Sequence, residues 1–201
     1  MKGHEFKRAY DSKARFASYW HQIDEVFKLH PASLLEVGVG TGFVALYLRH
    51  HGLSVTTLDV DSARNPDVVG SIKELPFPDG SFDCITACEV LEHMPYEDSE
   101  KALRELYRVA KTLVIISLPV ATPFLRFELP IPKITRFRKL LNLRFISPRQ
   151  PLHHEHSWEI GMRGYSLDRI MRSIRSAGFQ IKKEYRVLEN PRHHFFVLQK
   201  V

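Results

Sequence analysis

The sequence predicts an α/β fold in which parallel strands alternate with helices, and three observations support this prediction. A short apolar run from Leu34 stops at an acid, Glu36, and breaks into alternating glycines at Gly38, Gly40 and Gly42, which indicates a buried strand that turns sharply into a helix. A second apolar run ends at Asp59, nineteen residues after Gly40, where a doubly wound fold places an acid that accepts hydrogen bonds from ribose hydroxyls. Further apolar runs alternate with segments of helical periodicity along the chain. We therefore expect a ligand at the glycine turn.

Length and composition fit one globular domain. The 201 residues can bury a substantial core but are too few for two comfortable domains, so we expect a single domain over residues 1–201. No apolar run approaches the roughly 20 residues that span a bilayer, and residues 1–5 lack the apolar core of a signal peptide, so we expect a cytoplasmic protein. Cys84 and Cys88 are too few for a disulfide framework and are expected to be packed, reduced thiols.

Each element is placed by its periodicity and by the residues that end it. The strands are expected at residues 33–37, 53–58, 67–72, 82–87, 113–118, 179–188 and 194–200, the last two as an antiparallel pair. The helices are expected at residues 5–30 (one helix or two), 42–51, 98–110 and 166–178. Pro78-Asp79-Gly80 is a turn signal before the fourth strand. Ser166 is placed to cap the last helix, which closes at Gly178.

Three stretches resemble motifs of the class I S-adenosylmethionine-dependent methyltransferases. The dinucleotide fingerprint G-x-G-x-x-G would need a glycine where Phe43 stands, and the pattern is instead E-x-G-x-G-x-G starting at Glu36. The string L-P-F-P-D-G-S-F-D at residues 75–83 is nearly the consensus of the type 11 methyltransferase domain, and E-V-L-E-H at residues 89–93 continues the similarity. The resemblance implies a Rossmann-like, doubly wound sheet of seven strands in the order 3-2-1-4-5-7-6, with the last strand antiparallel and helices on both faces.

The same resemblance implies S-adenosylmethionine as the cofactor and S-adenosylhomocysteine as its product. The cofactor-binding positions that it implies are Glu36, Gly38, Gly40, Asp59, Ser71, Ile72 and Glu89. At Ser71 a hydroxyl stands where the family usually has a carboxylate toward the adenine amino group, so we expect a weaker adenine contact. His93 is the neutral-pH titrating group of the E-V-L-E-H motif, and either acts as a general base or caps a helix or bonds a loop carbonyl.

Residues 1–31 are expected to form a helical lid, because methyltransferases of this shape commonly cover the site with an N-terminal helical segment. Tyr10, Tyr19 and Trp20 are then the substrate-side candidates. Aromatic residues at helical spacing are otherwise packing residues.

Residues 120–165 form an insertion that is expected to stand over the active-site edge and to select the acceptor. Residues 124–149 carry a net charge of +6, equal to that of the whole chain. Ile134, Phe137 and Leu141 fall on one face if the segment is helical. Apolar residues interleaved with basic ones are the composition of a helix on an anionic membrane, or of a lid for an acidic or lipid-linked substrate. A solvated basic surface packed on the domain is the alternative, and nucleic-acid binding is disfavoured because no RNA-binding module is recognised.

The second half of the insertion concentrates side chains that transfer protons. His154, His156 and Trp158 are expected nearest the site, where the histidines orient and deprotonate the acceptor and Trp158 either lines the site or anchors the packing. A metal is not expected, because zinc spacing such as H-x-x-x-H is absent and methyl transfer from a sulfonium needs no metal.

The sequence therefore predicts an S-adenosylmethionine-dependent methyltransferase that acts by in-line transfer on a small-molecule or lipid-linked acceptor, in the cytoplasm with peripheral membrane contact through residues 124–149. One alternative is a non-catalytic, cofactor-binding regulatory or assembly protein. Another is a nucleic-acid or protein methyltransferase, although the Asn-Pro-Pro-aromatic signature of many amino-methylating nucleic-acid enzymes is missing after the fourth strand. The sequence does not predict the oligomeric state.

Overall fold

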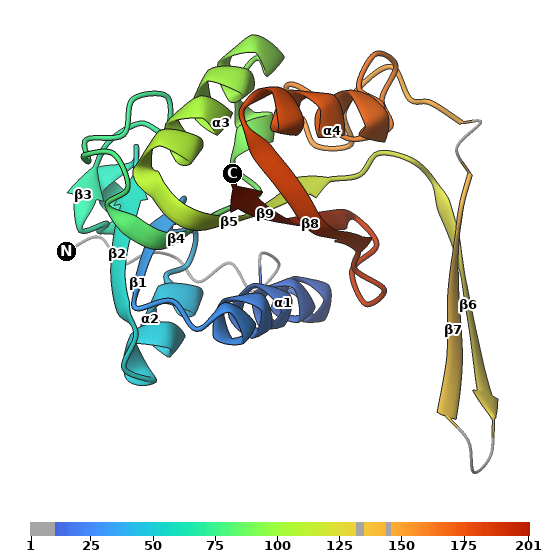
Figure 1. The fold of residues 1–201 in the computed structure, drawn as a ribbon. Helices are drawn as coiled ribbons and strands as arrows, with labels where there is room; N and C mark the ends of the chain where they lie inside the picture. Colours follow the sequence, from blue (N-terminus) through green and yellow to red (C-terminus); the bar gives the residue numbers. More distant parts are fainter. Residues whose placement is uncertain (1–10, 132–134, 144–145) are drawn as a thin grey trace.

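The computed structural model describes residues 11–131, 135–143 and 146–201, and it contains the predicted seven-stranded sheet (Figure 1). The spatial order is β3-β2-β1-β4-β5-β9-β8, in which β9 is antiparallel to both of its neighbours and the other pairs are parallel. The strands of this sheet are β1 (Ser33–Val37), β2 (Ser54–Asp59), β3 (Val68–Val69), β4 (Phe82–Cys88), β5 (Ala110–Pro119), β8 (Phe179–Arg186) and β9 (His193–Lys200). The predicted order and the antiparallel last strand are confirmed.

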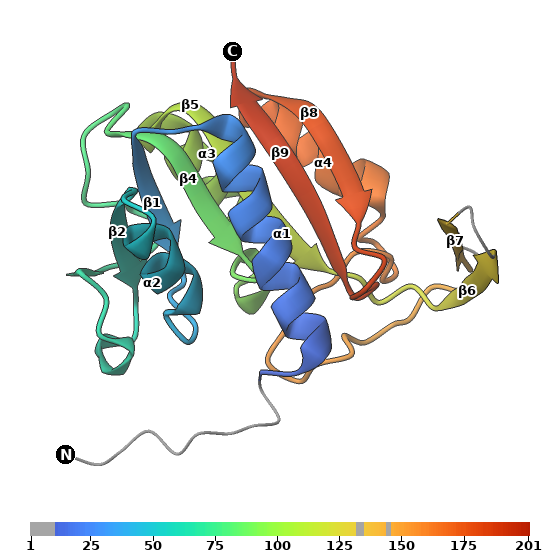
Figure 2. The same cartoon turned by 90° about the horizontal axis from the view of Figure 1, so that it is seen from below.

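Helices cover both faces of the sheet. Figures 1 and 2 show α1 (Lys13–Leu29) and α2 (Phe43–His50) on one face, and α3 (Tyr96–Val109) and α4 (Leu167–Ser176) on the other. Two short 3₁₀ turns, η1 (Ser62–Arg64) and η2 (Leu91–His93), follow β2 and β4. None of the described helices is both long enough and apolar enough to cross a membrane.

The central strands are buried on both sides, which explains why they are continuously apolar in sequence. In β1, Leu34 packs in the cluster beneath α1 and α2, whereas Leu35 packs in the cluster beneath α3 and α4, and both side chains are fully buried. Successive side chains of a strand point to opposite faces, so each strand contributes to both cores. Cys84 is buried and Cys88 partly buried, and both are free thiols, as predicted.

The helix ends follow their capping residues. Ser166 accepts a hydrogen bond of 3.2 Å from the backbone N–H of Arg169 and caps α4, as predicted. Ser12 caps α1 in the same way, so this helix begins at Lys13. The part of the predicted N-terminal helical segment that precedes residue 11, including Tyr10, lies outside the described residues.

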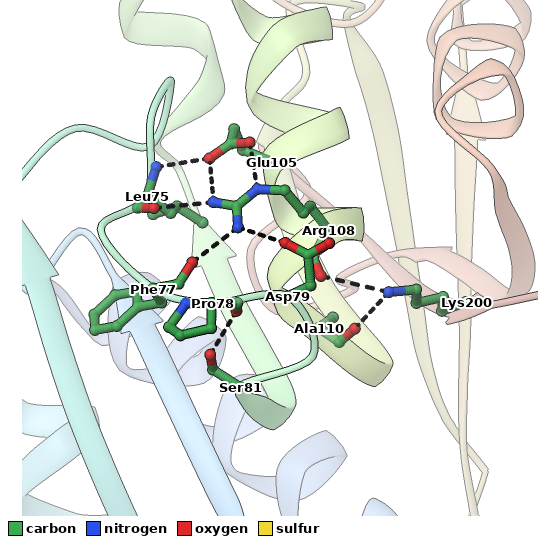
Figure 3. Close-up of polar contacts among 9 residues, drawn as sticks. All are labelled: Leu75, Phe77, Pro78, Asp79, Ser81, Glu105, Arg108, Ala110 and Lys200. Atoms are coloured by element: carbon green, nitrogen blue, oxygen red, sulfur yellow. Dashed lines mark hydrogen bonds and ion pairs between the residues drawn. The ribbon is translucent and has the colours of Figure 1, made fainter.

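Arg108 of α3 holds the loop that precedes β4 (Figure 3). Its guanidinium donates to the backbone carbonyls of Leu75 and Phe77 at 3.0 and 2.8 Å, and it bonds the carboxylates of Glu105 and Asp79 at 2.8 Å. The Glu105 carboxylate also accepts from the Leu75 N–H at 2.8 Å. A planar fork with five donors can satisfy several acceptors at once, so one side chain fixes the whole turn.

The basic first half of the insertion is a two-stranded antiparallel ribbon, and the helix expected there is wrong. Strands β6 (Phe124–Ile131) and β7 (Thr135–Asn142) pair with each other and project away from the seven-stranded sheet (Figures 1 and 2). Leu141 lies on β7, and Phe137 pairs with Leu129 of β6. Ile134 lies outside the described residues. The apolar residues of this segment fit the period of two of a strand as well as helical spacing. Each half of the segment can pair with the other half, and this pairing favours the ribbon.

Candidate functional site

A cavity of about 420 Å³ opens at the carboxyl ends of β1, β2 and β4. This is the edge at which open α/β sheets bind ligands, and the volume is within the range of small-molecule sites. All seven residues predicted to bind the cofactor line the cavity: Glu36, Gly38, Gly40, Asp59, Ser71, Ile72 and Glu89.

The glycine turn is tightly packed on the loop that follows β4. Gly38 has φ +82°, and a Cβ built on it would lie 2.5 Å from Cγ2 of Val90. Its N–H donates to the carbonyl of Leu58 at 2.8 Å, which ties the turn to β2. Both the backbone conformation and the close contact therefore require glycine at this position.

Asp59 ends β2 and is bonded to the glycine turn. Its Oδ2 accepts from the N–H of Val39 at 2.9 Å, and its Oδ1 accepts from the N–H of Asp61 at 3.0 Å. Each carboxylate oxygen has a further lone pair, so the side chain can still accept hydrogen bonds from two hydroxyls in the cavity. Asp61 accepts from the Ala63 N–H at 2.9 Å and caps η1.

Glu36 places a carboxyl group in the wall of the cavity. The residue is 5% exposed, and its Oε2 has no hydrogen-bond partner in the described part of the chain. Burial raises the pKa of Glu36 to about 8, although a backbone hydrogen bond from Ala45 and the charge of Arg49 act against this rise. A positively charged ligand group beside Oε2 would favour the ionised carboxylate and supply the missing partner.

Glu89 and His193 meet at the end of β4. Glu89 has φ +56°, its Oε1 accepts from the Ser117 hydroxyl at 2.8 Å, and its Oε2 lies 3.5 Å from Nε2 of His193. Burial lowers the pKa of His193. Sequence analysis did not find His193, because β9 runs antiparallel and only the three-dimensional fold brings its first residue to the carboxyl end of β4.

Ser71 and Ile72 form the wall that follows β3. The Ser71 hydroxyl accepts from the N–H of Lys73 at 3.2 Å, and Ile72 is 4% exposed and packed in the core. The chain runs from this turn into Leu75 and Phe77, whose carbonyls accept hydrogen bonds from Arg108.

His93 lines the cavity and contacts the second half of the insertion. Its Nδ1 lies 3.3 Å from the carbonyl oxygen of Glu155, which agrees with the predicted loop-carbonyl contact. Its ring meets the ring of His156 edge-on, with centroids 5.0 Å apart. Burial and the neighbouring His156 lower the pKa of His93.

The remaining candidates lie in different surroundings. Tyr19 lines the cavity, and its hydroxyl donates to Asp11 at 3.0 Å, while burial raises its pKa to about 12. Trp20 is 59% exposed and does not line the cavity. Trp158 is 1% exposed and packs edge-on against Tyr96, so it is a packing anchor of the core. The His154 side chain is 93% exposed.

Known proteins similar in sequence to this chain are methyltransferases. A family model described as a methyltransferase domain matches residues 35–116. The chain is 29% identical over 141 residues to demethylmenaquinone methyltransferase of Thermus thermophilus, which covers 57% of this chain and 63% of the relative. It is 29% identical over 107 residues to ajmaline N-methyltransferase of Rauvolfia serpentina, which covers 43% of this chain and 36% of the relative. The chain thus spans less than two thirds of these relatives.

Among solved structures, the fold is similar to that of magnesium protoporphyrin IX methyltransferase from Synechocystis PCC 6803 with bound S-adenosylhomocysteine. The TM-score is 0.69 at 11% identity, with 100% of this chain and 90% of that chain covered. At this identity the similarity concerns the fold alone.

Proposed function

We propose that this chain, which belongs to the class I S-adenosylmethionine-dependent methyltransferases through the domain at residues 35–116, transfers a methyl group to a small-molecule or lipid-linked acceptor. One observation carries the proposal. The unpartnered carboxyl oxygen of Glu36 and the carboxylate of Asp59 face the same cavity from neighbouring strands. An acid for a cationic group and an acid for a vicinal diol fit the amino-acid part and the ribose of this cofactor.

Different residues of the cavity would bind different parts of the cofactor. Asp59 would hold the ribose, and the turn at Gly38 and Gly40 would let the cofactor approach the backbone. Glu36 and Glu89 would face its positively charged groups. When bound, the cofactor supplies a methyl group on a positively charged sulfur, and the protein's part is to position the acceptor in line, where effective molarities of about 10⁵ M or more are available.

A base is required only for an acceptor that must lose a proton. Of the three histidines considered for this role, His93 is the one that lines the cavity, and its Nδ1 is occupied by the Glu155 carbonyl. Its Nε2 is therefore the atom that we assign to proton transfer, and His154 is not carried into the proposal because its side chain is exposed.

The ribbon supports contact with a lipid surface. Its register pairs Leu125 with Leu141 and Phe127 with Lys139, and these four residues share one face of the ribbon. Leu125, Phe127 and Leu141 are 48%, 50% and 46% exposed. Apolar side chains beside a lysine, on a projecting ribbon of basic composition, suit the interface of an anionic membrane, and a lipid-linked acceptor would be found there.

The test is transfer of a labelled methyl group from S-adenosylmethionine into a cell extract, which is then separated into lipid, small-metabolite, nucleic-acid and protein fractions. Label in the lipid or small-metabolite fraction, lost with Asp59→Ala, is the expected result. Label in the nucleic-acid or protein fraction would refute the proposed acceptor class. Cofactor binding by calorimetry without transfer to any fraction would favour the non-catalytic alternative.

A further inference from the structure

Hydrogen bonds to the backbone of the 3₁₀ turn η2 and of the residue after it join this turn to the second half of the insertion, beside the cavity. The N–H of Ser157 donates to the carbonyl of Glu92 at 2.7 Å, and Nε1 of Trp158 donates to the carbonyl of Met94 at 3.1 Å. These bonds bring together two segments that lie more than sixty residues apart in sequence. The side chains between them are therefore held in fixed relative positions.

Three potential metal ligands converge in this place. One ligand atom from each of Glu92, His93 and His156 lies within 4.8 Å of the other two. Glu92 is fully buried, and neither of its carboxylate oxygens has a hydrogen-bond partner in the described residues. An unsatisfied buried carboxyl group is costly, so a partner that fills this gap would be bound favourably.

Both imidazoles are oriented by a contact at Nδ1. Nδ1 of His93 lies 3.3 Å from the Glu155 carbonyl, and Nδ1 of His156 lies 2.9 Å from Oε1 of Glu159. When Nδ1 donates its proton to an oxygen, Nε2 keeps a free lone pair, which is the tautomer that metal-binding histidines use.

The oxygen that orients His156 is itself held in place. Oε1 of Glu159 also accepts from the backbone N–H groups of Leu152 and His153, at 2.9 and 3.2 Å, and the Glu159 side chain is almost completely buried. A carboxylate that bonds a histidine from behind is the usual outer-shell partner of a zinc-bound imidazole.

From this geometry we propose that Glu92, His93 and His156 bind a divalent transition-metal ion of the Zn²⁺ type. Two imidazoles and one carboxylate are a ligand set typical of such ions, and it leaves a fourth position open. Zinc ligands in tetrahedral geometry lie about 3.4 Å from one another, and the three atoms already lie within 4.8 Å of one another, so side-chain movements of about 1 Å would bring them into place.

The proposed metal site shares one residue with the cavity. His93 belongs both to the proposed metal site and to the cavity wall, so the ion would lie at the wall of the cavity. An ion on Nε2 of His93 would prevent this histidine from acting as a base, so the proton-transfer role assigned to Nε2 applies only to the metal-free protein. The open position of the ion would be available to an oxygen or nitrogen atom of the acceptor assigned under the proposed function, on which this consequence rests.

The experiment is zinc binding by the purified protein, measured by calorimetry and by the zinc-dependent shift in melting temperature. The wild type is expected to bind about one Zn²⁺ per chain. Glu92→Gln and His156→Ala are expected to weaken zinc binding by more than about 100-fold because each removes a ligand, and Glu159→Gln by about 10- to 100-fold because it releases His156. His154→Ala is the matched control, because His154 is an exposed histidine of the same segment.

Two further readouts keep the test decisive. Glu92→Gln without metal should melt close to the wild-type temperature, because an uncharged amide of the same size replaces the buried carboxyl group, and circular dichroism checks that each variant is folded. Co²⁺ should give visible bands in the wild type and in His154→Ala but not in His156→Ala. A wild type without zinc-dependent stabilisation, or equal zinc affinity in His156→Ala and His154→Ala, would overturn the metal site. Neither result decides whether the protein transfers a methyl group, which the labelling experiment measures separately.

Discussion

Oδ2 of Asp59 accepts a hydrogen bond of 2.9 Å from the backbone N–H of Val39, so the acid at the end of β2 is fixed to the glycine turn that follows β1. This contact positions the carboxylate at the cavity. Asp59→Ala removes both the contact and the two acceptors proposed for the ribose. Because hydrogen bonds to a charged group are worth about 1.5–3 kcal/mol each, we expect the Kd for S-adenosylhomocysteine to rise about 30-fold or more in calorimetry.

The control for this prediction is Asp61→Ala. Asp61 also lines the cavity edge, but its carboxylate caps η1, so its loss should change the Kd by only a few-fold. An Asp59→Ala variant that binds as tightly as Asp61→Ala would remove the ribose role.

The arrangement around Asp59 was predictable from sequence because it depends on local signals. A buried parallel strand is a continuous apolar run, and the glycines and the acid stand directly at the strand ends, so one-dimensional spacing determines which edge they share. His193 and the pairing of His93 with His156 were not predictable, because they depend on contacts between segments far apart in the chain. The ribbon was missed because residues 124–142 fit both periodicities.

The glycine turn predicts a difference between two similar substitutions. A Cβ at Gly38 would lie 2.5 Å from Cγ2 of Val90, whereas a Cβ at Gly40 would meet nothing within 4 Å, although both residues have positive φ. Gly40→Ala should cost about 1–2 kcal/mol in urea unfolding through backbone strain alone. Gly38→Ala should cost about 2–4 kcal/mol because overpacking adds to that strain. Equal losses would show that Val90 moves aside without cost.

The buried carboxyl group of Glu36 is expected to make the free energy of unfolding depend on pH. Its pKa of about 8 in the folded protein is raised from 4.5 by burial, so the folded state holds a proton that the unfolded state has released. The stability of the wild type should therefore fall as pH rises from about 4.5 to 8, relative to Glu36→Gln, which cannot ionise. Between pH 5 and pH 8 the difference should reach about 2–4 kcal/mol.

The measurement is urea unfolding of both proteins across this pH range. All other titrating groups are shared, so the difference between the two curves isolates Glu36. Curves that run parallel would mean that the carboxyl titrates normally in the folded protein.

Removal of the Arg108 guanidinium is expected to lower the free energy of unfolding. Arg108→Ala removes the donors for the carbonyls of Leu75 and Phe77 (Figure 3) and should destabilise the fold by about 2–3 kcal/mol, with allowance for a side chain that is 32% exposed. Arg108→Lys should recover only part of this loss, because an ammonium group cannot reproduce the planar fork. Arg104→Ala on the exposed face of the same helix is the control and should change the unfolding free energy by less than about 0.5 kcal/mol. Full recovery by lysine would indicate that charge, not geometry, holds the loop.

The ribbon predicts binding to anionic liposomes. The exposed side chains of Leu125 and Phe127 would enter the interface while basic residues of the ribbon attract the anionic headgroups, so the wild type should co-sediment with anionic liposomes and be released by salt. Phe127→Glu should abolish co-sedimentation, because it replaces an inserted ring by a charge that the headgroups repel. Leu46→Glu makes the same change in charge at a residue of α2 that is 70% exposed, and it should bind like the wild type. Equal sedimentation with neutral liposomes, or equal loss in both variants, would contradict insertion of the ribbon.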